Sequence, residues 1–476
     1  MKYLFLLISL FFSKVMGQDF ISIESHKVIS LIHFLDAAND VSHVSDEYRD
    51  WVAEKLESDP IFEQLVDRYA AIDLKYSVDR QHSYPMEGTV SGKPIIDVLV
   101  IEASNSQDIQ EFNQRIIGLL SEKVHTELIE TLLLVEPYYE KWIWKKKQNK
   151  LKQVQQKLSQ YKTKIEEVYS KASTFYGTPQ DKRIALKVVL VPIPIKKGET
   201  KTFSKGSVLV CETLLNNSED YLLRIILREV CHKLSKEQPL EFKNKIESWV
   251  ENVSSTQGKF AYLYLDEALA TTIGNRYEFK ELNGKMDTVA WYNNPYINGF
   301  AHAIYKQTEK YLQEEKQMDS IYIEKAIQAF EKIFPKTQND LQLLFKEIQL
   351  HTDIDTDKVK EVKNSFRYFF QVNSFWETPL IQEENEKTDI ARQSATKIFL
   401  IESNHQQNLD KITTLYPREK INIDGHFYSI YAFKNTETQG IILIINIFTF
   451  DAAMIETLIK NLSQKEYIEL EKWIDF

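Results

Sequence analysis

The sequence has few cysteines, no excess of basic residues and no apolar run long enough to cross a membrane. Its two cysteines among 476 residues, Cys211 and Cys231, allow at most one disulfide, so a disulfide-rich scaffold is excluded. The two thiols could pair or stay free and buried. The formal net charge of −10 offers no basic field to hold phosphate groups, so we expect no nucleic-acid partner.

The N-terminus has the pattern of a secretory signal peptide. Lys2 supplies a positive charge, residues 3–12 are apolar, and residues 13–17 offer small or aliphatic side chains at a cleavage site before Gln18. The apolar run is too short to span a bilayer, and no nearby cysteine would accept a lipid anchor. We therefore predict a signal peptide over residues 1–17 and a secreted or periplasmic mature protein without a transmembrane segment.

The rest of the chain is long enough for two or three domains. Residues 18–135 are predicted to be mainly helical, with one strand at 94–102, where PIIDVLVIE is dense in β-branched residues. The glycine-containing segment 81–93 is predicted to be a loop. Three helices are expected in this region, at 25–38, 45–56 and 59–74.

Residues 136–376 are predicted to form a second domain. A long polar helix is expected at 138–174, where apolar residues recur three and four apart, and one core-facing stripe is favoured over a coiled coil. Gly177 would end this helix. Two strands are predicted next, at 184–195 and 206–213, and helices from 220 to 370.

A charged, turn-rich stretch at 377–396 is predicted to be a linker to a small α/β module, residues 397–476. No catalytic constellation is recognisable in this module, so packing or interaction is its expected role. Its expected elements are a strand at 397–402, a helix at 405–415, a hairpin of 427–433 with 440–450, and a pair of helices over 452–476.

The segment 221–234, YLLRIILREVCHKL, sets Arg228, Glu229 and His232 among apolar residues at helical spacing. Residues four apart lie one above the other on a helix, so the side chains at positions 228 and 232 could bind the same ion or ligand, with Glu229 beside it. In the pattern H-E-x-x-H, two histidines bind zinc while the glutamate activates a bound water. A second predicted helix at 262–275 carries Asp266 and Glu267, followed by small residues that allow close packing.

An apolar strand that begins at a glycine, a helix with an HExxH-like string and a later helix with Glu-Ala-Leu-Ala together resemble the gluzincin zinc metallopeptidases. The resemblance covers roughly residues 138–310. It implies a helix-rich α+β fold with a zincin-like core, in which the strand at 206–213 is the edge along which a peptide lies. It also implies that His232 and Glu267 correspond to zinc ligands and Glu229 to the general base. Three residues could stabilise the transition state, and the sequence does not choose among them: Tyr292, Tyr296 and His302.

Arg228 departs from the family pattern, because it stands where the first histidine ligand belongs. A guanidinium has no lone pair to donate and stays protonated, so it cannot bind zinc and would repel it. His232 and Glu267 then fall short of the three protein ligands of catalytic zinc sites. The guanidinium could instead take the place of the metal, with a bidentate contact to Glu267 or Glu229. We therefore predict an inactive pseudopeptidase that lacks zinc and keeps a cleft for a peptide or protein ligand.

Two alternatives remain open from the sequence. An altered metal site completed by His302 or Asp266 would make the protein an active zinc metallohydrolase. Cys231 does not replace the missing ligand in this interpretation, because neighbouring helix positions point about 100° apart. In the other alternative, Glu229 and His232 are an ion pair or satisfied core groups, and the protein has a structural or interaction role without a cleft function.

Overall fold

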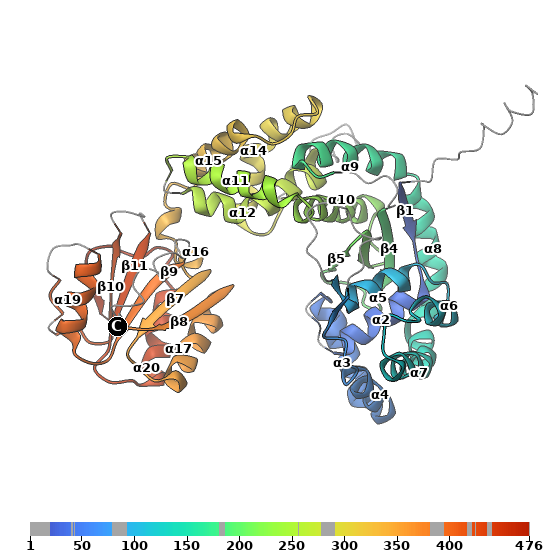
Figure 1. Ribbon diagram of the computed structural model, residues 1–476, viewed down its shortest axis with the longest axis horizontal. Coiled ribbons are helices and arrows are strands. Elements are labelled where there is room, and N and C mark those ends of the chain that lie inside the picture. Colours follow the sequence, from blue (N-terminus) through green and yellow to red (C-terminus); the bar gives the residue numbers. More distant parts are fainter. Residues whose placement is uncertain are drawn as a thin grey trace, which may run out of the picture. The chain divides into compact units, whose positions relative to one another are not determined.

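The fold is taken from a computed structural model (Figure 1). The structure describes residues 20–39, 41, 43–78, 93–179, 186–255, 257–277, 291–380, 395–416, 421–423, 425–435 and 440–475. The predicted signal peptide, nearly all of the predicted loop at 81–93 and most of the predicted linker lie outside these ranges. The chain divides into two units, which we describe separately: unit 1 is Met1–Trp249 with Tyr264–Ile323, and unit 2 is Val250–Leu263 with Glu324–Phe476. None of the described helices has the length and apolar character of a membrane span.

Unit 1 contains a four-stranded sheet in the order β1-β4-β6-β5. Strands β1 (Ile21–Glu24), β4 (Leu186–Pro192) and β6 (Val208–Thr213) run parallel, and β5 (Thr202–Lys205) is antiparallel to β6. The predicted strands at 184–195 and 206–213 are confirmed, and their apolar character follows from near-complete burial. The expectation that the 206–213 strand is the edge is wrong, because β5 pairs with its outer side.

The helices predicted at the start of the chain are confirmed as α2 (Lys27–Ala38), α3 (Asp46–Ser58) and α4 (Pro60–Ala70). Asp59 begins α4 by accepting a hydrogen bond from the Phe62 backbone N–H at 3.1 Å. The strand predicted at 94–102 is wrong, because these residues lie in helix α5 (Ile95–Ser104), preceded by the short pair β2 (Ser77–Val78) and β3 (Lys93–Pro94).

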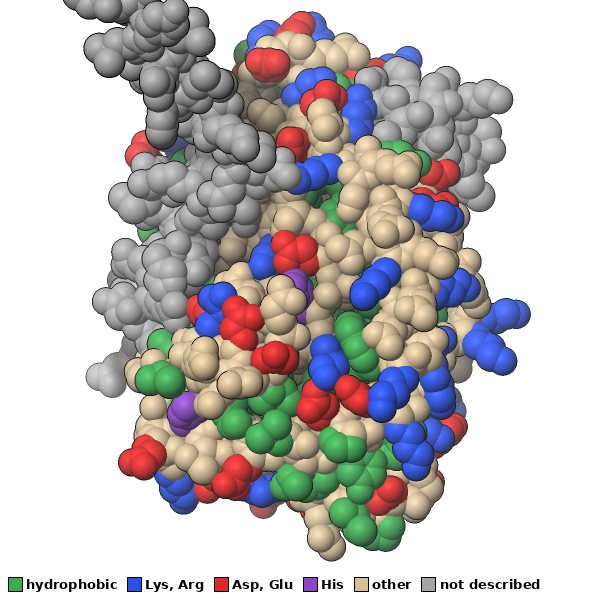
Figure 2. All heavy atoms as spheres, turned by 90° about the vertical axis from the view of Figure 1, so that its right-hand side faces the viewer, with side chains coloured by type: hydrophobic (Ala, Val, Ile, Leu, Met, Phe, Trp, Pro, Cys, Tyr) green, Lys and Arg blue, Asp and Glu red, His purple; other side chains and the backbone are tan. Residues whose placement is uncertain are grey.

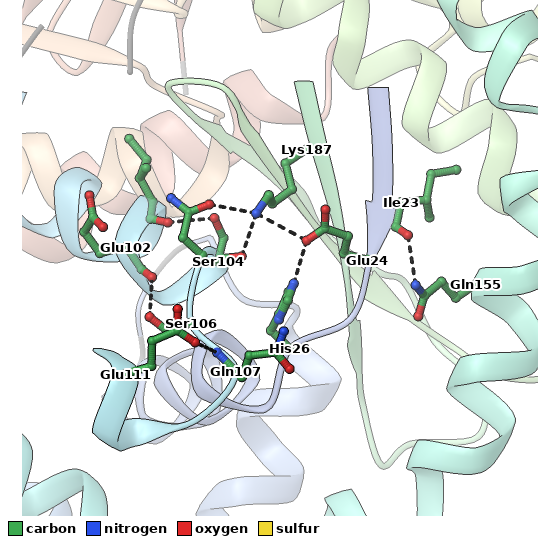
Figure 3. Close-up of polar contacts among 12 residues, drawn as sticks. Ile23, Glu24, His26, Glu102, Ser104, Ser106, Gln107, Glu111, Gln155 and Lys187 are labelled. Atoms are coloured by element: carbon green, nitrogen blue, oxygen red, sulfur yellow. Dashed lines mark hydrogen bonds and ion pairs between the residues drawn. The ribbon is translucent and has the colours of Figure 1, made fainter. Parts of the chain in front are cut away.

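Polar contacts connect the C-terminal end of α5 to the sheet of unit 1 (Figure 3). The Lys187 ammonium of β4 donates to the Ser104 carbonyl at 2.9 Å and to Asn105 Oδ1 at 2.7 Å, and it lies 3.2 Å from the Glu24 carboxylate of β1. His26 contacts the same carboxylate at 2.6 Å. Burial opposes the charge of Glu24, but His26 and Lys187 prevail and lower its pKa to about 2.

The long helix predicted at 138–174 is divided. α6 (Ile109–Arg115) and α7 (Glu122–Tyr139) lead through a π-helical segment, η2 (Glu140–Trp144), into α8 (Lys145–Ser159), and α9 (Lys162–Tyr176) follows after a turn. Five residues of the predicted core-facing stripe, Leu151, Val154, Leu158, Ile165 and Val168, are buried, whereas the sixth, Tyr161, lies in the turn between α8 and α9 and is only partly buried. Gly177 ends α9 in a left-handed conformation with φ 65°, as predicted.

The next helices agree with the sequence up to residue 333. They are α10 (Glu219–Lys236), α11 (Leu240–Asn252), α12 (Gly258–Ala270) with its π-helical continuation η3 (Thr271–Tyr277), α14 (Pro295–Gln313) and α15 (Ser320–Ile333). Figure 2 shows one face of unit 1, where Lys and Arg side chains alternate with Asp and Glu and hydrophobic side chains gather on the lower part. No single sign of charge dominates that face.

Unit 2 is built on a six-stranded sheet in the order β12-β10-β11-β9-β7-β8. Strands β8, β7, β9 and β11 run parallel to one another, whereas β10 is antiparallel to both of its neighbours, β11 and β12. The strands are β7 (Glu347–Thr352), β8 (Ser374–Pro379), β9 (Thr396–Ile401), β10 (Ser429–Lys434), β11 (Ile441–Asn446) and β12 (Trp473–Asp475). The shorter helices are η4 (Thr337–Asn339) and α16 (Leu341–Leu344), and the longer ones α17 (Thr356–Phe369), α19 (His405–Leu415) and α20 (Ala452–Ser463).

Both faces of this sheet are covered by helices. Leu409 and Ile412 of α19 share a core with Ile444 and Phe399, and α17 packs with α20 on the other side (Figure 1). The predicted strand at 397–402, the helix at 405–415 and the hairpin are confirmed. Three expectations are wrong. The chain ends in strand β12 rather than a second helix, and β7 is a strand inside the stretch 220–370 that was predicted to be helical. In addition, β7 and β8 belong to this sheet although they precede the expected boundary at 397.

Candidate functional site

Helix α10 carries the first part of the candidate site. Ser218 caps it by accepting a hydrogen bond from the Tyr221 backbone N–H at 3.3 Å, and Glu219 and Asp220 in the first turn suit the positive end of the helix dipole. Apolar residues at helical spacing are buried, as expected from the sequence, and they set the rotation of the helix. Glu229 and His232 are buried with them, at 8% and 7% exposure, whereas Arg228 is half-buried.

The helix formed by α12 and η3 approaches α10 at the level of Arg228. A Cβ placed on Gly274 would lie 2.6 Å from the Arg228 backbone nitrogen and 2.8 Å from its Cα. A side chain at position 274 is therefore impossible without moving one of the two helices. This contact confirms the expectation of close packing, and it brings Glu267, two turns earlier, to the side of α10 where His232 lies.

His232 lies between two carboxylates of α12. Its Nδ1 is 2.8 Å from Asp266 Oδ2, within hydrogen-bonding distance, and its Nε2 is 3.5 Å from Glu267 Oε1. The imidazole is 8% exposed, whereas the side chains of Asp266 and Glu267 are 46% and 35% exposed. The structure therefore brings together His232 and Glu267, the two residues predicted to correspond to zinc ligands, and adds Asp266 on the opposite ring nitrogen.

The carboxylates hold His232 in its charged form. Burial alone would favour the neutral imidazole, but the hydrogen bond to Asp266 and the interaction with Glu267 outweigh it and raise the pKa of His232 to about 9. In return, His232 lowers the pKa values of Asp266 and Glu267 against the opposing effect of burial, and Arg228 adds to the effect on Glu267. At neutral pH the group is an imidazolium between two carboxylates.

Arg228 does not make the bidentate contact that the sequence suggested. Its Nη2 is 3.8 Å from Glu229 Oε1, which is an ion pair beyond hydrogen-bonding distance, and its guanidinium lies 5.3 Å from the centre of the Tyr292 ring. Among the described residues, no Arg228–Glu267 pair comes within 4.0 Å. Burial raises the pKa of Glu229, although His232 and Arg228 oppose that rise. Burial and then the charge of Glu267 raise the pKa of Tyr292.

The remaining candidate residues are placed as follows. Tyr296 stacks on Tyr264 with ring centroids 5.5 Å apart, and exposed His302 stacks on Trp291 at 3.6 Å. Neither contact involves His232 or Glu267, so of the three residues proposed for the transition-state position only Tyr292 is placed beside Arg228. Cys211 and Cys231 are both buried and are not joined by a disulfide.

The donor set around His232 does not fit a catalytic zinc ion. His232 Nε2 lacks a hydrogen-bond partner among the described residues and faces the Glu267 carboxylate. These two groups supply two zinc-ligand types on this side of the imidazole. Asp266 occupies the other ring nitrogen, where outer-shell partners of metal ligands lie, so it cannot complete the set from that side. The third ligand of the pattern is its first histidine, and this sequence has Arg228 there, whose guanidinium has no lone pair to donate.

The sequence interpretation missed a second group of polar residues in unit 1. Among the residues that the structure describes, His33, Asp36 and His43 are the group of at least three His, Cys, Asp or Glu side chains whose ligand atoms lie within 4.8 Å of one another. The only sequence signal was an H-x-x-D pair in a predicted helix with a further histidine seven residues on, a spacing too common to be informative. None of these residues belongs to the resemblance described above.

Comparisons with protein-family models, curated proteins and solved structures found no match for this chain.

Proposed function

We propose that the protein is a secreted or periplasmic, metallopeptidase-like protein that has lost zinc catalysis and binds a peptide or protein ligand. One observation supports the proposal: His232 and Glu267 face each other at 3.5 Å, while Arg228, which stands in the sequence where the pattern has its first histidine, lies 3.8 Å from Glu229. A cation, the His232 imidazolium, already neutralises Glu267, so the carboxylate does not need a metal ion for charge balance.

The sheet next to α10 supports the binding part of the proposal. Among the described residues, β5 is one of the two edge strands of the sheet, β1 being the other, and it packs against α10. An extended peptide can add to such an edge through main-chain hydrogen bonds, with side-chain specificity supplied by neighbouring groups. Arg228, Glu267 and Tyr292 are partly exposed and offer both signs of charge and an aromatic ring to a ligand.

Metal analysis and peptidase assays test the loss of zinc catalysis. We expect the purified mature protein to lack chelator-sensitive hydrolysis of fluorescent casein, and to hold no zinc whose binding depends on His232. Two results together would contradict the proposal and favour an active metallohydrolase: bound zinc that is lost on His232→Ala, and peptidase activity that a chelator abolishes.

Restoring the histidine tests the correspondence with the metallopeptidase pattern. Arg228→His adds a third ligand beside His232 and Glu267, so we expect one further equivalent of bound zinc, measured by calorimetry, which disappears in the double variant Arg228→His/His232→Ala. Arg224→His changes the same residue type one helical turn earlier and is the matched control, with no expected gain. Equal zinc binding by the Arg228→His variant and the wild type would count against the correspondence.

Ligand binding requires a separate measurement. A fluorescein-labelled tryptic digest of casein supplies extended peptides of varied sequence, and fluorescence anisotropy would report their binding. We expect saturable binding that Arg228→Gln and Glu267→Gln weaken and that Arg224→Gln leaves unchanged. Absence of saturable binding would favour a structural role without a cleft function.

A further inference from the structure

Three side chains with ligand chemistry converge at the end of α2. His33 and Asp36 are three residues apart on this helix and so project from the same face, and His43 follows in the turn before α3. One ligand atom from each lies within 4.8 Å of the others. His33 and Asp36 are 1% and 6% exposed, and the His43 side chain is 24% exposed. The group is thus buried at His33 and Asp36 and accessible to solvent at His43.

Glu212 of β6 fixes the orientation of the His33 ring through a hydrogen bond with Nε2. Its Oε1 lies 2.9 Å from His33 Nε2 and also accepts the Ser45 backbone N–H at 3.0 Å, while its Oε2 accepts the Lys201 N–H at 2.8 Å. Both oxygens of Glu212 thus accept backbone N–H groups, and His33 donates to the same carboxylate through Nε2.

In the neutral form of His33, a proton on Nε2 leaves a lone pair on the other ring nitrogen. In a neutral imidazole whose Nε2 carries the proton, Nδ1 is an acceptor. His33 Nδ1 is buried and has no hydrogen-bond partner among the described residues. A carboxylate on one ring nitrogen and a metal ion on the other is a frequent arrangement of histidine ligands, because the carboxylate fixes the tautomer and makes the ligating nitrogen more basic.

Asp36 and His43 complete the group. His43 Nε2 lies 3.0 Å from Asp36 Oδ2, and the Tyr69 hydroxyl contacts Asp36 Oδ1 at 3.5 Å. The Phe203 ring of β5 covers the two imidazoles, with centroids 4.2 Å from His43 and 5.8 Å from His33. Under this aromatic ring, the mostly buried group offers a divalent cation the Asp36 carboxylate, the lone pair of His33 Nδ1 and, in place of its hydrogen bond to Asp36, a nitrogen of His43.

We propose that His33, Asp36 and His43 bind a zinc ion, with Glu212 as the outer-shell partner of His33 and one coordination position left for water. Two imidazoles and one carboxylate suit a borderline cation such as Zn²⁺ better than Mg²⁺ or Ca²⁺, which prefer oxygen ligands. Bonds of about 2.0–2.2 Å place the ligand atoms of a tetrahedral zinc roughly 3.4 Å apart, so small rotations of side chains already within 4.8 Å suffice. The ion would join α2 and the turn before α3 to the sheet through Glu212.

Zinc titration of the mature chain after chelator treatment tests this site. We expect calorimetry to show one equivalent of zinc bound, and Co²⁺ to give the visible absorption of a tetrahedral complex. His43→Ala should lower zinc affinity by more than about 100-fold, and Glu212→Gln by about 10- to 100-fold, which is the usual cost of losing an outer-shell partner. His43 lies in a partly exposed turn, so circular dichroism of this variant in chelator should match the wild type and show that it folds.

His426→Ala is the matched control, because His426 also faces a carboxylate, Asp475, at 3.0 Å, but in unit 2 and without a third ligand nearby among the described residues. It should leave zinc binding unchanged. Failure to bind zinc, or binding that survives both His43→Ala and Asp36→Asn, overturns the proposal. Binding that is lost on His232→Ala instead places the ion at α10 and contradicts this proposal together with the proposed function, so the two failures can be told apart.

Discussion

At the residue scale, His232 sets the charge balance of the α10 site. Its imidazolium lies between Asp266 and Glu267, whereas Arg228 contacts Glu229 and Tyr292. Helical spacing alone was enough to predict that positions 228, 229 and 232 gather on one side of a helix. The choice of partner for each cation depends on where α12 meets α10, which is a tertiary contact that no local pattern encodes.

The raised pKa of His232 predicts a pH-dependent stability. Its folded-state pKa of about 9 exceeds the ordinary value of 6.5, so its contribution is complete below pH 6.5 and is lost as the pH rises through 9. The full shift corresponds to about 3 kcal/mol at about 1.4 kcal/mol per pKa unit, but solvent screens the half-exposed Asp266. We expect about 1–2 kcal/mol of unfolding free energy to be lost between pH 6 and pH 9.5, measured by urea denaturation.

His232→Gln provides the reference for this measurement, because it keeps a side-chain donor but does not titrate. The variant should be less stable than the wild type at pH 6, and the difference between the two proteins should shrink as the pH approaches 9.5. Parallel stability profiles across this range would show that His232 does not carry the assigned charge.

At the scale of elements, the sequence was most informative where periodicity and caps agree. α4 begins after Asp59, and α9 ends at Gly177, as the residue types predict. The segment that became α5 was misassigned because Ile95, Val98 and their apolar neighbours are buried on all sides of the helix. A helix without an exposed face has no amphipathic period, so its β-branched residues indicate a strand equally well.

Two of the missed strands, β5 and β12, went unrecognised because of their length. β5 has four residues, all of intermediate burial, and β12 has three, so neither is long enough to show an alternating pattern. β5 exists because β6 offers its outer edge, and its register, with Thr202 opposite Cys211, is set by that pairing. Strands of this kind depend on a partner that lies elsewhere in the chain and cannot be recognised from their own residues.

Gly274 offers a test of how α10 and η3 are held together. In Gly274→Ala the new methyl group would meet the Arg228 backbone at 2.6 Å, and neither helix backbone can yield as a flexible side chain could. We expect the variant to lose about 2–3 kcal/mol of unfolding free energy, the usual cost of overpacking, despite the higher helix propensity of alanine. Denaturant unfolding would measure the loss.

Gly258→Ala is the matched control within the preceding helix α12. Its added Cβ would find its nearest neighbour, the Val250 carbonyl oxygen, at 3.5 Å, which is ordinary van der Waals contact. We expect this variant to be unchanged or more stable by up to about 1 kcal/mol. If the two variants have the same stability, the close approach of η3 to α10 is not a constraint on the fold.

At the scale of the whole molecule, the chain is organised as two units, each with its own sheet. The composition change near residue 396 suggested a module that starts there, and β9, α19 and β11 do follow it. However, β9 pairs in parallel with β7, and the first residue of β7, Glu347, lies 49 residues before the first residue of β9, Thr396. Parallel pairing needs a long connection, so a boundary drawn from local composition cannot include the earlier strand.

Separate cores predict that the two units respond separately to core mutations. Ile444 is fully buried in the core of unit 2, and Ile95 is fully buried in that of unit 1. Truncation of either isoleucine to alanine should cost about 2–5 kcal/mol locally, through lost transfer free energy and the cavity left behind. Hydrogen exchange read by mass spectrometry should then show faster exchange of β9 and β11 in Ile444→Ala, and of α2 and β4 in Ile95→Ala, with little change in the other unit.

The pair of variants serves as its own control, because the same residue type is truncated at two fully buried positions. If each unit unfolds as a cooperative block, exchange of all slow amides within that unit should accelerate together, which distinguishes unit-wide opening from fraying near the mutation. Equal acceleration in both units, whichever isoleucine is truncated, would mean that the chain unfolds as one cooperative structure. In that case zinc bound at His33, Asp36 and His43 should also protect the amides of unit 2, whereas independent units confine the protection to unit 1.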